Sequence, residues 1–478
     1  MAERALQLNS RSPKAQSLAG EAEMALGNLD AARDHLRRAV QLGLNSAAVH
    51  RDLGMIGLKQ KQLGNAQREF ELALQFQPDD YPSLYGLGLS HLLQKQPAQA
   101  LIQFTKAYGL NKSDPSLLMG MLDAHIQLGQ KSEASAILAE LDAKLDGNYD
   151  QQLQLAGLLV NEGAYDLGIE ELERLRKTNP DSPELDYDLA LAYHRAGHQT
   201  AAATLLHSML AHRDDAELED LLGDVEGKSG NHTQALLAYQ RAIKLEPSNE
   251  EYQFDYAEEL ATNWNPNQAL EVFANNIKNF PQSAKMWLGW GATYYLVGKY
   301  PEAAKTLLHA AEIAPKNPDV YQLLGLVYEA AGSLQEAVAN QFSAYLRTDP
   351  PDARAHYYYG KMLVVQSRHG SQVDLTQAKR ELERAIQLNP NLAPAYTELA
   401  TLLSMRGQTE AARNQLETAV RLDPESSEAY YQLMQVYRKL GQHAQAQDAY
   451  RKFEQLKAKQ GETNRREQVK GFFSEPRQ

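Results

Sequence analysis

A segment of about 34 residues recurs along nearly the whole sequence and constrains the fold more than any other feature. Its most regular part runs from Ala235 to Pro247 and has the pattern Ala-x3-aromatic or Leu-x2-Ala-x4-Pro. Further copies of this part occupy residues 303–315, 378–390 and 412–424. Each repeat in such an array buries its apolar surface against its neighbours. One elongated domain is therefore expected, where a chain of 478 residues would otherwise suggest about three.

Aligned on this pattern, the chain contains thirteen full repeats, nearly all of 34 residues. We number them one to thirteen: 13–46, 47–80, 81–114, 115–148, 149–182, 183–215, 216–249, 250–283, 284–317, 318–352, 353–392, 393–426 and 427–460. Apolar residues at the fourth, seventh, eighth and eleventh places have helical spacing, and so do those at the twentieth, twenty-fourth and twenty-seventh. Each repeat is therefore predicted to form two helices, named helix A and helix B.

The residues between these helices have physical roles. Nine repeats carry Gly at the fifteenth place, for example Gly298, where helix A ends and a left-handed backbone is needed. The twentieth place is Ala in twelve repeats and Gly168 in the other, which lets helices A and B approach closely. Pro at the thirty-second place, as in Pro247, stops helix B.

This pattern resembles the tetratricopeptide repeat family, whose 34-residue helix-turn-helix units have small residues at the eighth, twentieth and twenty-seventh places. Repeat nine carries the pattern most completely, with Trp287, Trp290, Gly291, Tyr294, Gly298, Ala303, Leu307, Ala310 and Pro315. The resemblance implies an all-α, right-handed superhelical α-solenoid of about thirteen units. It also implies a scaffold that binds proteins, because most members of the family serve in this way.

The predicted domain organisation has three parts. Residues 13–460 form one solenoid domain, and residues 1–12 form a partial repeat that contains the second helix only. Residues 461–478 form either a capping helix, with Val469, Phe472 and Phe473 on one face, or a tail. Because Met1 falls within a repeat, we infer that upstream sequence is missing, and an export signal could have been lost with it. The sequence therefore does not decide between a cytoplasmic and an exported protein.

Composition narrows the possible partners. The net charge of -13 argues against general binding of nucleic acids, which requires clustered Lys and Arg. The absence of cysteine excludes disulfides, thiolate metal sites and cysteine nucleophiles. No apolar run is long enough to span a membrane as a helix.

Sequence motifs for catalysis are absent. The chain has no glycine-rich phosphate loop, no HExxH and no Gly-x-Ser-x-Gly. The best metal candidate is the group His194, His198, His207 and His212, but Gly197 separates the first two, and scattered surface histidines are the simpler interpretation. We therefore predict a protein that is not an enzyme and that uses no cofactor or metal.

The fifth and ninth places of helix A carry many apolar and aromatic residues, on a face about 100° from the buried stripe. This face resembles the concave, partner-binding surface of the tetratricopeptide repeat family, so we expect it to bind a peptide or a partner helix. The alternative is that a tight superhelix buries these side chains against itself. The predicted residues are Met55, Tyr85, Leu89, Met119, Leu153, Tyr187, Leu191, Phe254 and Tyr357.

The same face is acidic in repeats seven and eight, beside Phe254. If the carboxylates converge they favour a basic partner, whereas a solvated acidic face is the simpler interpretation. We expect Asp220→Lys with Asp224→Lys to weaken partner binding without unfolding the array. The acidic residues are Glu217, Asp220, Asp224, Glu251, Asp255 and Glu258.

Three departures from the pattern predict local differences. Large residues replace small ones at Leu122, Leu141, Leu175 and Met209, which predicts altered stacking in repeats four to six. The segment 263–266 replaces the glycine turn of repeat eight, and an Asn there is expected to take the left-handed conformation. About six extra residues near 367–372 predict a longer loop in repeat eleven.

The sequence therefore predicts a non-catalytic scaffold that binds a protein or peptide in its groove. Two alternatives remain open. One is a structural module that self-associates. The other is the substrate-recognition arm of an enzyme complex or of a truncated larger enzyme.

Overall fold

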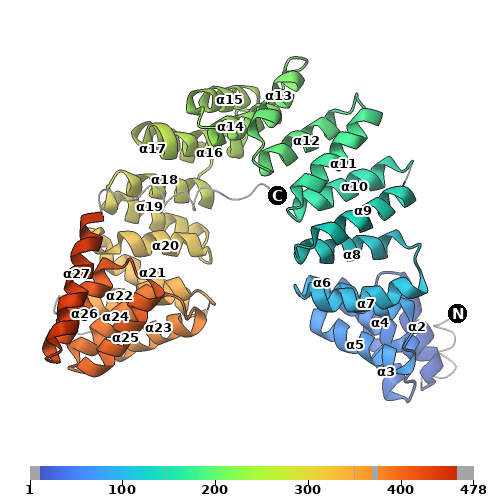
Figure 1. Cartoon of the computed structure of the whole chain (residues 1–478), viewed down its shortest axis with the longest axis horizontal. Helices are drawn as coiled ribbons and strands as arrows, with labels where there is room; N and C mark the ends of the chain where they lie inside the picture. Colours follow the sequence, from blue (N-terminus) through green and yellow to red (C-terminus); the bar gives the residue numbers. More distant parts are fainter. Residues whose placement is uncertain (1–10, 146, 349, 369–374, 460–478) are drawn as a thin grey trace. The chain divides into compact units, whose positions relative to one another are not determined.

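The computed structural model describes residues 11–145, 147–348, 350–368 and 375–459, and every regular element in them is helical. In repeats one to six the helix pairs are α2 (Pro13–Ala25) and α3 (Leu29–Gln41), α4 (Ala47–Lys59) and α5 (Leu63–Phe76), α6 (Tyr81–Leu93) and α7 (Pro97–Leu110), α8 (Pro115–Gln127) and α9 (Lys131–Leu145), α10 (Tyr149–Asn161) and α11 (Tyr165–Thr178), α12 (Pro183–Arg195) and α13 (Gln199–Leu210) (Figure 1).

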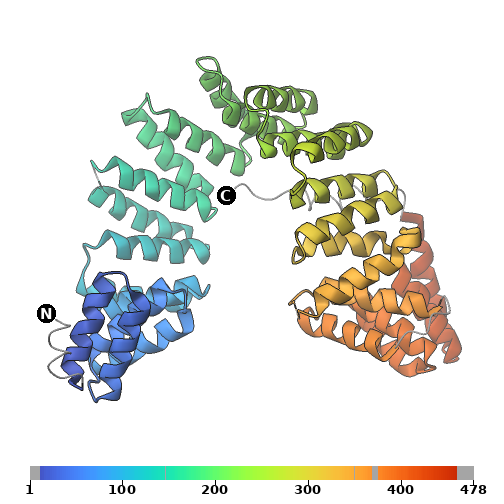
Figure 2. The ribbon, with the colours of Figure 1, turned by 180° about the vertical axis from the view of Figure 1, so that it is seen from behind.

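In repeats seven to thirteen the elements are α14 (Ala216–Lys228) and α15 (His232–Leu245), α16 (Glu250–Glu259), η1 (Leu260–Trp264) and α17 (Pro266–Asn279), α18 (Ala284–Leu296) and α19 (Tyr300–Ile313), α20 (Pro318–Val327), η2 (Tyr328–Ala330), η3 (Gly332–Leu334) and α21 (Gln335–Leu346), α22 (Ala353–Arg368) and α23 (Leu375–Leu388), α24 (Ala393–Met405) and α25 (Thr409–Leu422), α26 (Ser427–Lys439) and α27 (His443–Lys459). The paired helices can be followed from behind in Figure 2. The chain is an all-α solenoid of helix pairs.

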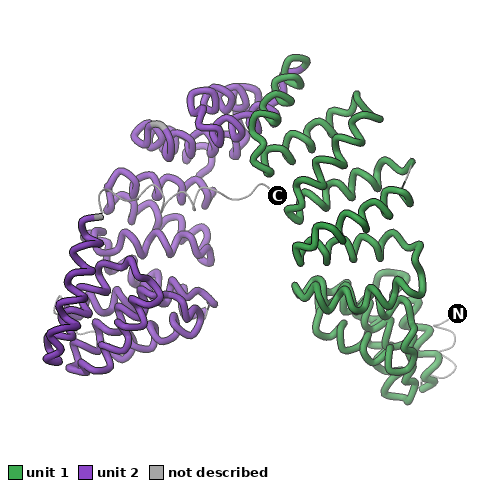
Figure 3. Tube along the Cα trace, viewed as in Figure 1, with its two compact units in different colours: residues 1–212 green, residues 213–478 purple. Residues whose placement is uncertain are grey.

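The chain divides into two compact units, residues 1–212 and 213–478 (Figure 3). The sequence predicts one domain over residues 13–460, and the boundary falls within repeat six.

Helix A begins at the first residue of every predicted repeat, as α4 does at Ala47 and α18 at Ala284. The residue before it often caps the helix with its side chain. Ser283 Oγ accepts the backbone N–H of Met286 at 3.0 Å, and Asp80 Oδ2 accepts that of Ser83 at 3.1 Å. Such caps satisfy backbone donors that the first turn of a helix leaves without a partner.

The turn between helices A and B requires a left-handed residue at the fifteenth place. All nine predicted glycines have positive φ there, which confirms their role. In repeats two and three the place is filled by Lys61, with φ 56°, and Lys95, with φ 58°. The repeat geometry therefore imposes this conformation even on residues that pay a steric cost for it.

Repeat eight makes the turn in another way. The π-helix η1 follows α16, and the backbone N–H of Asn265 donates to the carbonyl of Leu260 at 2.7 Å. Asn263 lies within η1 and Asn265 has φ -143°, so the prediction of a left-handed Asn is wrong. A wider helical turn replaces the left-handed residue.

Repeat ten contains one residue more than the standard length, and the structure places it before helix B. Two short 3-10 turns precede α21, which begins one place later than helix B does in the repeats without extra residues. As a result Ala337, assigned to the buried twentieth place, is exposed, and Val338 is buried instead. The assignment of Ala337 to the core is therefore wrong.

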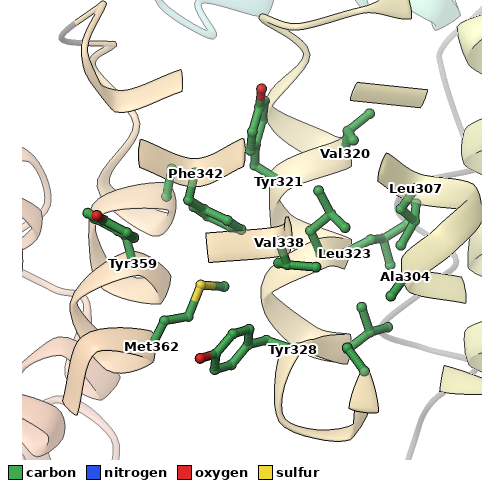
Figure 4. Close-up of a cluster of buried hydrophobic side chains, with 14 of the residues drawn as sticks. Ala304, Leu307, Val320, Tyr321, Leu323, Tyr328, Val338, Phe342, Tyr359 and Met362 are labelled. Carbon is green, nitrogen blue, oxygen red and sulfur yellow. The ribbon is translucent and has the colours of Figure 1, made fainter. Parts of the chain in front are cut away.

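The second compact unit has one large continuous apolar core, from Phe254 to Val436, and a smaller cluster that contains Ala216, Ala242 and Tyr252. In the part drawn in Figure 4, Tyr321 and Phe342 approach edge to face with ring centroids 5.4 Å apart. The first compact unit holds several smaller clusters. The large residues Leu122, Leu141, Leu175 and Met209 are buried, so the packing accommodates them; the predicted change in stacking stays a prediction.

Some predictions fall on residues outside the described ranges. They are the partial repeat in residues 1–10, most of the repeat-eleven insertion, and the capping helix or tail in 461–478. Among the helices that the structure describes, none is both long and apolar enough to cross a membrane.

Candidate partner-binding surface

In the first compact unit, the predicted surface residues on helix A are half-buried. Tyr85 shows their typical environment: it stacks on Tyr81 with ring centroids 6.5 Å apart and tilts against Phe104 at 6.1 Å. Burial and the Asp114 carboxylate raise the pKa of its hydroxyl. Each of these side chains therefore packs on its neighbours on one side and reaches solvent on the other. The set comprises Met55, Tyr85, Leu89, Met119, Leu153, Tyr187 and Leu191.

In the second compact unit the predicted surface residues fall into two groups that differ in burial. Asp224, Glu258 and Tyr357 are half-buried, whereas Asp220 and Phe254 are each only 2% exposed. Phe254 packs edge to face on Phe273, with ring centroids 6.0 Å apart.

The ammonium of Lys285, from the next helix A, lies 4.2 Å from the centroid of the Phe254 ring. Phe254 therefore belongs to the core and does not offer its ring to a partner. For this residue the structure agrees with the alternative interpretation, in which the side chain is buried against neighbouring residues of the same chain.

Asp224 is fixed by a tyrosine of its own repeat. The hydroxyl of Tyr239, on α15, donates to Asp224 Oδ1 at 2.7 Å. The ring fits because Gly223 has no Cβ, which would lie 2.4 Å from the ring. Burial and the carboxylates of Asp224 and Asp255 raise the pKa of the Tyr239 hydroxyl well above its usual range.

The carboxyl of Glu258 has a strongly raised pKa. Burial, together with the negative charges of Asp255 and Asp224, raises the pKa of its carboxyl to about 9, although the ammonium of Lys285 opposes the shift. Lys285 is shared, because its Nζ lies 2.6 Å from Glu251 Oε1. The charges of Asp224 and Asp255 thus act on Glu258, whereas the docking of a basic partner at these carboxylates stays a prediction.

Sequence reasoning missed a second charged group in this compact unit. Glu398, on α24, is only 6% exposed. Burial raises the pKa of its carboxyl against the opposing effect of Lys361, and the net result is about 7. Lys361 Nζ also lies 2.7 Å from Glu329 Oε1. The field of Glu398 contributes, after burial, to the raised pKa of Tyr357.

The signal that could have revealed Glu398 is its place in the repeat. It occupies the sixth place of helix A, and so do Asp52 and Asp188. Burial raises the pKa of both these carboxyls as well. An acidic residue at this place therefore indicates a partly desolvated carboxyl.

Among the described residues, no group of three or more His, Asp or Glu side chains is arranged to hold a metal ion.

Comparison with known families agrees with the geometry. Models described as tetratricopeptide repeat match residues 1–47, 17–81, 153–216, 220–249, 381–414 and 406–453, and a model described as TPR repeat matches 291–332. Together these matches cover more than half of the chain. The chain is a tetratricopeptide repeat protein. Its repeats place it among the protein-interaction scaffolds of this family.

Relatives share the repeats at low identity. A TPR repeat-containing protein of Treponema pallidum (strain Nichols) is 23% identical over 321 residues, which cover 65% of this chain and 38% of that protein. The Homo sapiens protein O-mannosyl-transferase TMTC1 is 24% identical over 188 residues, covering 38% of this chain and 21% of that protein. The chain thus matches less than half the length of either relative.

Among solved structures, yeast Tom70 aligns over 96% of this chain and 94% of its own, with 18% identity and a TM-score of 0.38.

Proposed function

We propose that this tetratricopeptide repeat protein binds a peptide segment or helix of a protein partner on its helix-A face, and that a Lys or Arg of the partner docks beside Asp224, Asp255 and Glu258. The observation that supports the proposal is the environment of Glu258. Two neighbouring carboxylates and burial disfavour its charge, while Lys285 is shared with Glu251. Glu258 therefore keeps its proton at neutral pH. A cation from a partner would be attracted by Asp224 and Asp255 before contact and would favour release of that proton on docking.

In the first compact unit, the half-buried residues of the same face offer apolar contacts. Met55, Leu89 and Leu153 each reach solvent at the helix-A surface of their repeats. Apolar side chains at helical or extended spacing on a partner would lose water against such residues. The predicted partner therefore combines apolar side chains with at least one basic side chain.

The test uses the full chain and a displayed library of random twelve-residue peptides. We expect the selected peptides to be enriched in Lys and Arg. Binding of the strongest peptide, followed by fluorescence anisotropy, should weaken about ten-fold or more in the variant Asp224→Asn with Glu258→Gln. Asn at position 224 keeps an acceptor for the Tyr239 hydroxyl, so the variant should stay folded.

A matched control removes two carboxylates from exposed helix-B positions, Glu271→Gln with Glu302→Gln. Its affinity should stay within about two-fold of the wild type, because exposed charges are screened over about 10 Å. Selected peptides without basic residues, or equal losses in both double variants, would refute the docking of a basic side chain.

A further inference from the structure

A cavity of about 340 Å³ lies between α3, α4 and α5 of the first compact unit, and none of the residues proposed above to bind a partner lines it. Its charged lining consists of Arg33, Arg37, Arg68 and Glu69. Three guanidinium groups and one carboxylate give the lining an excess of positive charge. This excess stands out in a chain of net charge -13.

Two of the guanidinium groups are held in place by neighbouring side chains. Arg33 Nη1 donates to Gln60 Oε1 at 2.8 Å, and Arg33 Nη2 lies 2.7 Å from Asp30 Oδ1. Arg68 Nη2 donates to Asn65 Oδ1 at 2.7 Å. Side chains ordered in advance lose less entropy when a ligand binds.

The third guanidinium group is available. Arg37 is exposed and makes no hydrogen bond or ion pair with any residue that the structure describes. The one carboxylate of the lining is engaged elsewhere, because Glu69 Oε2 lies 2.6 Å from His50 Nδ1. Gln62, the N-cap residue of α5, also lines the cavity, and its side chain makes no hydrogen bond to the backbone of the first turn. The positive end of the α5 dipole therefore adds to the field of the arginines.

We infer that this cavity binds a phosphate group through Arg33, Arg37 and Arg68. A phosphate dianion offers several acceptor oxygens, and planar guanidinium groups match their geometry with paired N–H donors. The amides of Gln62 and Asn65 supply further polar groups at the wall. The phosphate could be free in solution or carried on a phosphorylated side chain of a partner.

Calorimetric titration of the full chain with inorganic phosphate, at fixed ionic strength in sodium chloride, tests the inference. We expect saturable binding that weakens about ten-fold or more in the variant Arg37→Gln with Arg68→Gln. The control is Arg38→Gln, which removes one positive charge from α3 at a residue outside the cavity lining. Its affinity should stay within about two-fold of the wild type, and circular dichroism should show unchanged helicity in both variants.

A second titration distinguishes the two sources of phosphate. The peptide Ala-phosphoserine-Ala with blocked ends is compared with inorganic phosphate and with the unphosphorylated peptide. Tighter binding of the phosphopeptide would support a phosphorylated partner, and equal binding would support free phosphate. No saturable heat with either phosphate, or equal affinity in all variants, would overturn the inference.

Discussion

The hydroxyl of Tyr239 donates a hydrogen bond of 2.7 Å to Asp224 Oδ1 and so ties helix B of repeat seven to the acidic surface of helix A. The tyrosine is almost fully buried, and its ring packs where Gly223 leaves room. The carboxylate most central to the proposed surface is thus positioned from the core.

Tyr239→Phe removes this hydrogen bond and keeps the packing of the ring. We expect the free energy of unfolding to fall by about 1 kcal/mol, because a buried donor–acceptor pair is lost while Asp224 stays half-solvated. Urea unfolding followed by circular dichroism measures the change. The control Tyr300→Phe deletes a hydroxyl without a described hydrogen-bond partner and should change little; equal losses in the two variants would contradict the role of the bond.

Lys61 and Lys95 occupy left-handed turns that favour glycine. Lys61→Gly and Lys95→Gly should each stabilise the protein by about 0.5–1 kcal/mol, because relief of steric strain exceeds the entropy that glycine adds to the unfolded chain. Thermal unfolding would show the gain as a higher Tm. The control Lys106→Gly, at an exposed position inside α7, should instead destabilise by about 1 kcal/mol.

These turns show what the repeat pattern predicts well. The period places the start of each helix A, and nine glycines identify the left-handed turns. The burial of Phe254 was not predictable in the same way, because it depends on Lys285 of the next repeat and on Phe273 of helix B. Likewise Glu398 gains its raised pKa from burial among helices of neighbouring repeats. The repeat pattern gives the residue type at each place, but it does not give such contacts between the helices of one repeat or between neighbouring repeats.

Raising the pH should destabilise the second compact unit through Glu258. The usual pKa of a glutamate is 4.5, and the folded protein raises that of Glu258 to about 9. Between these values the unfolded chain releases the proton and the folded chain keeps it, so the free energy of unfolding falls as the pH rises. We expect the Tm to drop by a few degrees from pH 5 to pH 9, and to drop less in Glu258→Gln. An equal drop in both proteins would assign the effect to other groups.

Charge reversal at the two aspartates should have different consequences. Asp224→Lys places an ammonium at a half-buried position and should leave the protein folded. Asp220→Lys forces a longer, charged side chain into a position only 2% exposed and should cost on the order of 3 kcal/mol. The expectation that both substitutions together preserve the fold is therefore revised. Separate melting curves for the single variants decide this, and a Tm for Asp220→Lys equal to that of the wild type would contradict it.

The π-helix in repeat eight has a consequence for how the array tolerates sequence change. In repeat one the N–H of Asn28, at the sixteenth place, donates to the carbonyl of Glu23, at the eleventh. Asn265 and Leu260 make the same bond across η1, and α17 begins at the same place as helix B elsewhere. The absence of the glycine thus changes only the turn between the two helices, and helix A of the next repeat still begins at its first residue, Ala284. The hydrogen bond between the sixteenth and eleventh places thus keeps helix B and the following repeat in register. The loss of a single turn glycine therefore need not shift the packing of later repeats.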